Sequence, residues 1–224
     1  MYRPSIRFAG TNRWLVAAFL LAAAALALSG GCRSAIATAL YFFKGDDVGP
    51  EYAALKGKKV AVVCRAPADL NYADSAAGRE LVREMSKLLQ ERVGKIKVVD
   101  AQKVNKWCEE NKWEEYAEVG KALQADVVVG VELEKFGIYQ ARTLYQGKAN
   151  ASVHVYDCKD GGKVLFEKIL PQTVYPPNAY IQTSDVQESE FRREFIAVLA
   201  DQIARHFYGH DPYADLGRDN SALR

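Results

Sequence analysis

The chain has 224 residues, of which 49% are hydrophobic and 26% are charged. These ordinary globular values exclude a disordered chain and a polytopic membrane protein. The 30 basic and 28 acidic side chains give a formal charge of +2, but three of the arginines lie in the first 13 residues, where there is no acid. In the rest of the chain acids slightly outnumber bases, so the composition gives no support to nucleic-acid binding.

The N-terminus has the pattern of an export signal. Three basic residues (Arg3, Arg7 and Arg13) precede fifteen apolar residues, Trp14–Leu28, and the small residues Ser29, Gly30 and Gly31 lead to a cysteine. A basic start, a short apolar run and a small-residue exit are typical of secretory signals. A membrane-spanning helix needs roughly 20 apolar residues, and this run is shorter. The sequence therefore predicts a signal peptide over residues 1–31.

Cys32 is the candidate lipidation site. Its surroundings resemble a bacterial lipoprotein signal, although Leu28 lies four residues before the cysteine and the usual leucine lies three before it. Acylation there would make the lipid bilayer a partner of the chain. By the same resemblance, Arg33 favours the periplasmic face of the outer membrane, with an inner-membrane anchor as the alternative. An uncleaved N-terminal helix and ordinary secretion also stay open.

Residues 32–50 are predicted to connect this N-terminus to a folded domain. A second apolar patch, Ala35–Phe43, is either a membrane-surface helix or a segment that docks on the domain, and we expect docking. Lys44–Pro50 is polar and contains Gly and Pro, as a tether does. The domain is expected over residues 51–209 and a frayed tail over 210–224.

Three further cysteines, Cys64, Cys108 and Cys158, lie in the predicted domain. An exported chain can form disulfides, but three cysteines allow at most one internal bridge. Their spacing matches neither a zinc ligand pair nor a CxxC redox motif. We expect all three to be small buried hydrophobic residues.

The domain begins with alternating strand and helix signals. Ser75 is a plausible N-cap and Gly94 a plausible end for the first helix, and Asp100 is a plausible N-cap for the second. The predicted elements are a strand over 60–64, a helix from 75 to 93, a strand over 96–99, helices over 101–111 and 114–124, and a strand over 126–133.

The second half of the domain predicts a hairpin and a final helix. Across Tyr145–Tyr156 small or apolar residues alternate with polar ones, which indicates a strand with one wet face. The polar positions are Gln146, Lys148, Asn150, Ser152 and His154. Asp160-Gly161-Gly162 predicts a tight turn into a partner strand over 163–170. A capping-box-like pair, Asp185 and Glu188, precedes a helical stripe of Phe191, Phe195, Leu199, Ile203 and Phe207, which Gly209 ends.

Together these signals predict one α/β (α+β) domain with a mixed sheet of about five strands packed by helices, in the order β-α-β-α-α-β-β-β-α. Three stretches carry a resemblance: Lys59–Val63, Val119–Gly130, and Val155-Tyr156-Asp157 followed by Asp160–Leu165. With the lipoprotein signal, they resemble the domain shared by CsgG-type secretion lipoproteins, the N-terminal domain of TolB and PelC-like periplasmic lipoproteins. The resemblance spans about residues 58–208.

The resemblance implies a binding or assembly protein that oligomerises, and it supplies no catalytic residue. A CsgG-type pore needs long spare hairpins of about 9–11 residues per strand. The predicted hairpin of 144–156 with 163–170 belongs to the core fold, so we do not expect a pore.

Two groups of residues resemble chemical sites. His154, Tyr156 and Cys158 alternate on one strand with Asp157 between them, as a Cys–His nucleophile pair would require. Side chains two residues apart on a strand are about 7 Å from each other, so we expect a wet sheet face instead. His206 and His210 have the spacing of a two-His metal site, with Asp211 beside them, but Gly209 breaks the helix between them.

The remaining candidates have structural explanations. Asp69, Asp74 and Glu80 are expected to be solvated around a helix start. Gly130 and Gly137 flank a strand and form no phosphate-binding loop. Trp107 and Trp113 belong either to a partner-docking patch or to the packing of a helical connection, and we expect packing.

The sequence thus predicts a membrane-tethered, non-catalytic scaffold of the cell envelope, forming homo-oligomers and meeting an envelope partner that the residues do not identify. We expect no catalytic residue, no cofactor, no metal and no nucleic acid. The alternative is a small periplasmic enzyme such as a hydrolase, because residues far apart in sequence can converge in a fold.

Overall fold

The computed structural model describes residues 48–66 and 72–212, with only the backbone described for 72–75. The predicted signal, Cys32, the apolar patch at 35–43 and the tail beyond Pro212 lie outside the described residues. The elements are β1 (Lys59–Arg65), α3 (Tyr72–Arg92), β2 (Lys97–Val98), α4 (Ala101–Glu110), α5 (Tyr116–Ala122), β3 (Val127–Ala141), β4 (Leu144–Asp157), β5 (Val164–Ile169), β6 (Thr173–Tyr175), β7 (Ile181–Gln182), α6 (Glu188–Ala204) and the 3-10 turn η1 (Arg205–Phe207).

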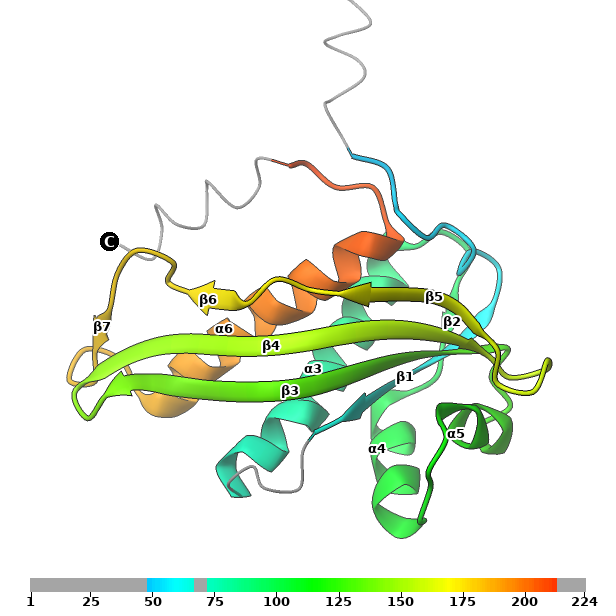
Figure 1. The fold of residues 1–224 in the computed structure, drawn as a ribbon, viewed down its shortest axis with the longest axis horizontal. Helices are drawn as coiled ribbons and strands as arrows, with labels where there is room; N and C mark the ends of the chain where they lie inside the picture. The colour runs from blue at the N-terminus through cyan, green and yellow to red at the C-terminus, as the bar shows by residue number, and fades with distance from the viewer. Residues whose placement is uncertain (1–47, 67–71, 213–224) are drawn as a thin grey trace, which may run out of the picture. The chain divides into compact units, whose positions relative to one another are not determined.

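The strands form one mixed sheet, which confirms the predicted fold class (Figure 1). Its order is β2-β1-β3-β4-β5, and the short strands β6 and β7 also pair with β4. The β2–β1 and β1–β3 pairs are parallel, and the others are antiparallel. The predicted strand at 126–133 is therefore central, between β1 and β4.

Helices cover the sheet unevenly. The main core lies between the sheet and the pair α3 and α6, and it includes Val129, Val153 and Phe195. A smaller cluster under α4 and α5 contains Ala61, Val128 and the aromatic ring of Tyr116. In Figure 1, α3 and α6 lie behind β3 and β4, and α4 and α5 lie at the lower right near β1. On the near face of β3, β4 and β5, α5 packs only at the end that carries Val128 and Tyr156, and no described helix crosses the rest of that face in the figure.

Two predicted helix starts are wrong. Helix α3 begins at Tyr72, so Ser75 lies inside it. Helix α6 begins at Glu188 itself, with Gln187 at the cap position and no side-chain cap, so Asp185 and Glu188 form no capping box. The cap at Asp100 is confirmed, since its carboxylate accepts a hydrogen bond of 3.0 Å from the Lys103 backbone N–H.

Among the described residues, no helix is long and apolar enough to cross a membrane.

Strand β3 is longer than predicted because it continues through a bulge. The register with β4 shifts between Leu133 and Lys135, which makes Glu134 the extra residue. The hairpin between β4 and β5 closes as predicted at Gly161 and Gly162, whose φ angles of 64° and 84° favour glycine. Asp157 supports that turn, because its carboxylate accepts backbone hydrogen bonds from Lys159 and Asp160.

Candidate interaction surface

The most extensive unpartnered feature of the described residues is one side of the sheet, which we call the open face. It is the side of β3, β4 and β5 opposite α3 and α6, seen in the foreground of Figure 1, and α5 packs on the end of it that carries Val128 and Tyr156. Strand alternation places every second residue of β4 on it. Its side chains are Glu132 and Lys135 from β3, Lys148, Asn150, Ser152, His154 and Tyr156 from β4, and Val164, Glu167 and Ile169 from β5.

The strand register aligns these residues across the sheet. Ser152 lies between Glu132 on β3 and Ile169 on β5, and His154 pairs with Glu167. Toward the other end of β4, Asn150 pairs with Lys135. Side chains paired in this way share one face and lie about 5 Å from each other at Cβ.

Strand β5 is an edge of the sheet, and it carries exposed aliphatic side chains. Ile169 is 74% exposed and Val164 is 46% exposed. An edge strand presents backbone N–H and C=O groups that are able to pair with another chain. Exposed aliphatic residues on such an edge favour association, because their burial removes apolar surface from water.

An aromatic row crosses from α5 to β4 at one end of the open face. We give this name to Trp113, Tyr116, Tyr156 and His154, whose successive ring centroids lie 5.5, 4.9 and 5.9 Å apart. The guanidinium of Arg65 lies 4.6 Å from the Trp113 ring centroid and 4.8 Å from that of Tyr116, and it donates to the Glu114 carbonyl. Such cation–π contacts fix this end of the face in one arrangement.

The predicted wet face is confirmed in part and wrong at two positions. Lys148, Asn150 and His154 are partly exposed, but Gln146 and Ser152 are buried. Gln146 donates to the carbonyls of Pro176 and Ala179, at 3.2 and 3.4 Å. The loop that brings those carbonyls over β4 was not predicted from the sequence.

Cys158 and His154 do not form the nucleophile pair considered from the sequence. Cys158 is buried in the smaller core cluster, where its sulfur packs closely against Gly120. His154 instead lies 3.2 Å from the hydroxyl of Ser152, between Nε2 and Oγ. Burial raises the pKa of the Cys158 thiol to about 11, so the thiol stays protonated and is a weak nucleophile.

The other two cysteines described are also free thiols. Burial raises the pKa of Cys64 to about 12 and that of Cys108 to about 11. Both line a hollow of about 270 Å³ at the end of β1, beside Asn105 and Trp113. The expectation of burial is confirmed for Cys158, whereas Cys64 and Cys108 are only half-buried.

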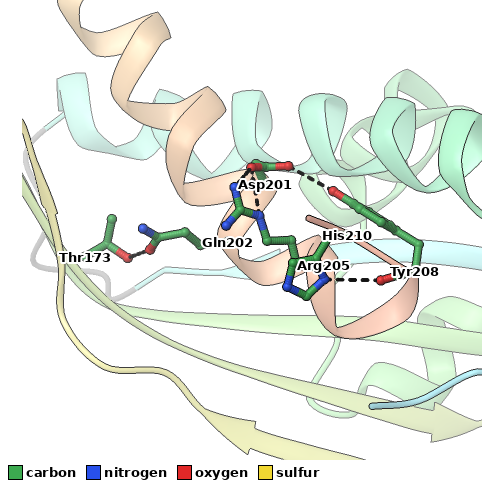
Figure 2. Close-up of polar contacts among 6 residues, drawn as sticks. All are labelled: Thr173, Asp201, Gln202, Arg205, Tyr208 and His210. Carbon is green, nitrogen blue, oxygen red and sulfur yellow. Dashed lines mark hydrogen bonds and ion pairs between the residues drawn. The ribbon is translucent and has the colours of Figure 1, made fainter. Parts of the chain in front are cut away.

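The C-terminal end of α6 forms a polar junction with the segment that enters the domain. Figure 2 shows the Asp201 carboxylate between Arg205 and Tyr208. Its Oδ2 accepts a hydrogen bond of 2.6 Å from Nη2 of Arg205, and its Oδ1 accepts one of 2.9 Å from the Tyr208 hydroxyl. Thr173 donates to Gln202 nearby at 2.6 Å. The backbones of Val48 and His210 pair in both directions, which joins the two ends of the described chain.

His206 and His210 both lie at this junction but have different partners. His206 Nδ1 is 3.1 Å from Glu51, and His210 Nδ1 is 3.4 Å from the Tyr208 carbonyl. Both line a hollow of about 350 Å³ with Gln202. In the described part of the chain, no cluster of three or more His, Cys, Asp or Glu side chains is able to hold a metal ion.

The charges at the junction act on each other. A hydrogen bond from Lys168, 2.9 Å from the carboxylate, lowers the pKa of Glu51. Burial lowers the pKa of His206 below its ordinary value of 6.5, although Glu51 acts in the opposite direction. His206 is therefore predominantly neutral at pH 7.

The remaining candidates take structural roles. Trp107 and Trp113 pack against the smaller core, which confirms the packing interpretation. Gly130 makes room for Tyr116, because a Cβ there would lie 2.8 Å from the ring. Asp69 and the side chain of Asp74 lie outside the described residues, and Glu80 lies within α3.

No protein-family model matches the chain, and no curated protein matches it. Similar solved structures include the lipoprotein GNA1162 from Neisseria meningitidis, at 13% identity, covering 65% of this chain and 97% of that one, with a TM-score of 0.40. The PelC dodecamer from Paraburkholderia phytofirmans is 13% identical, and the match covers 71% of this chain and 93% of the PelC chain, with a TM-score of 0.40. The LpoB C-terminal domain from Salmonella enterica is 11% identical, and the match covers 53% of this chain and 82% of the LpoB chain, with a TM-score of 0.31.

These similar structures include bacterial lipoproteins and PelC. At such low identities and TM-scores, the similarities assign neither a family nor a function to the chain. The resemblance to CsgG and TolB stays a prediction from the sequence.

Proposed function

We propose that this chain is a lipid-tethered, non-catalytic scaffold on the periplasmic face of the bacterial outer membrane, which assembles with further copies of itself and with an envelope partner. The observation that carries the proposal is the open face together with the β5 edge. Beyond the end where α5 packs, no helix of the described residues covers this side of the sheet, and Ile169 at its border is 74% exposed, so the surface is suited to association.

The tether is supported by the sequence and by the place where the domain begins. The signal pattern leads to Cys32, and fifteen residues separate that cysteine from Val48. Val48 then pairs with His210, so the chain enters the domain at a fixed point beside the end of α6.

The alternative, a small enzyme, has less support from the described side chains. The three thiols have raised pKa values, which makes them weak nucleophiles. Ser152, the hydroxyl next to His154, is only 5% exposed and is therefore poorly placed to meet a substrate. These observations favour the scaffold.

The tether is tested by labelling growing cells with a fatty-acid probe. The full chain is expected to carry the label and to remain in the membrane fraction, whereas Cys32→Ser is expected to lose the label. The matched control is Cys108→Ser, which removes a thiol of the domain and should leave the label unchanged. Equal labelling of the wild type and Cys32→Ser would contradict a lipid anchor at this residue.

The scaffold role is tested by chemical cross-linking in intact cells. Bands at multiples of the chain mass, and a reproducible additional envelope protein, are the expected result. A chain that cross-links neither to itself nor to any envelope protein would contradict a scaffold.

A further inference from the structure

The charged residues of the open face are divided between its two ends. A line across the strands between Ser152 and Asn150 separates an acidic half, with Glu132 and Glu167, from a basic half, with Lys135 and Lys148. Arg65 of β1 pairs with Glu132 at the border of the acidic half, where Trp113, Tyr116 and the Glu114 carbonyl hold its guanidinium. Glu134, the bulge residue, lies outside this register. The acidic half also holds the exposed aliphatic residues and the aromatic row.

A two-fold axis along that dividing line would superpose unlike charges. On β3, Glu132 and Lys135 lie next to this line on its two sides. The axis would therefore place Glu132 of each copy over Lys135 of the other copy. Glu167 pairs with His154, and both it and Lys148 lie one residue pair farther from the dividing line than Glu132 and Lys135 do. The axis would therefore bring Glu167 near Lys148 of the second copy. Isologous interfaces require this kind of self-complementary surface.

The spacing of packed sheets is compatible with these contacts. Sheets that stack face to face lie about 10 Å apart, which Glu and Lys side chains bridge from both sides. The same arrangement would cover Ile169 and Val164, the two exposed aliphatic residues of β5. The open face therefore offers both apolar area and paired charge to a second copy.

We propose that the open face is the interface of a two-fold dimer, in which the acidic half of each copy packs on the basic half of the other. This inference rests on the proposed function, because it names the surface through which the scaffold associates. The occupant is a second copy of this chain, since the charge pattern is complementary to itself.

Charge reversal and mixing test the proposal on the full chain extracted in mild detergent. The acidic variant carries Lys135→Glu and Lys148→Glu, and the basic variant carries Glu132→Lys and Glu167→Lys. Light scattering after size exclusion is expected to show loss of the dimer for each variant alone, because like charges then meet across the axis. An equimolar mixture is expected to recover the dimer. The matched control, Lys103→Glu with Lys112→Glu, alters two exposed lysines of α4 and the turn after it and should keep the wild-type mass.

Thermal melts of both variants establish that they are folded before their masses are compared. Variants that keep the wild-type mass would overturn this interface while leaving the scaffold in place. Folded variants that stay monomeric when mixed would overturn the charge pairing. A wild-type chain that is monomeric throughout would overturn the self-association on which both proposals rest.

Discussion

At the scale of single residues, Gly147 shows how closely α6 packs on the sheet. A Cβ at this position would lie 2.6 Å from Cδ1 and Cδ2 of the Phe195 ring. Gly147→Ala is therefore expected to lower the free energy of unfolding by about 1–3 kcal/mol, as overpacking of a core does. Urea denaturation measures the change. Gly137→Ala on β3 is the matched control, since a Cβ there has no neighbour within 4 Å, and an equal loss in both variants would contradict the close contact.

The lowered pKa of His206 predicts a dependence of stability on pH. The unfolded chain binds a proton at His206 more readily than the folded chain does, because burial disfavours the charged ring. The free energy of unfolding should therefore fall as the pH drops below about 6.5, and His206→Gln should remove this part of the decline. Urea titrations at pH 7.5 and pH 5.5 measure the difference between wild type and variant. A decline of the same size in both would contradict the assignment to His206.

Some candidate sites were predicted wrongly because spacing along the sequence does not show which distant residues a side chain contacts. The interval between His206 and His210 suggested a shared ligand, yet Gly209 lets the chain turn so that each ring meets a different partner. Glu188 suggested a cap, but its carboxylate accepts a hydrogen bond of 2.7 Å from the Tyr139 hydroxyl, 49 residues away. Long-range partners of this kind leave no local signal.

At the scale of elements, β3 is the centre of the fold. Val129 on β3 is 0% exposed and belongs to the core under α3 and α6. Val129→Asp would bury an unpaired carboxylate, so we expect a loss of several kcal/mol, comparable to the whole stability of a domain. The measurement is the yield of soluble protein and its melting temperature. Thr143→Asp in the exposed β3–β4 turn is the control, and a Val129→Asp protein that melts like the wild type would contradict burial of this strand.

The order of the elements was predictable because each has a strong local pattern. Runs of β-branched residues marked β1 and the start of β3, and period-two alternation marked β4. The second half of β3 was missed, since Glu134 and Lys135 interrupt the alternation where the bulge occurs. Strands β6 and β7 were missed because each has only two or three residues and depends on pairing with β4.

At the scale of the whole described fold, the candidate surface comes from three strands that lie side by side. The sequence predicted the polar side of β4, because the alternation of that strand is local. It did not predict Glu132, Lys135 or Ile169 as neighbours of that side, since their positions depend on the register of β3 and β5. It also did not predict that the loop before β7 would bury Gln146.

The central claim, that the chain associates through the open face of its sheet, is tested most directly by the mass of the detergent-extracted full chain over a dilution series. Ile169→Lys places a charge on the β5 edge, and Val48→Lys is the matched control at another exposed apolar residue, 46% exposed and paired with His210 at the junction away from the open face. Light scattering is expected to give an associated mass for the wild type and Val48→Lys, and a single-chain mass for Ile169→Lys at the same micromolar concentration. A single-chain mass for the wild type at every concentration, or an Ile169→Lys variant that associates like the wild type, would contradict the claim.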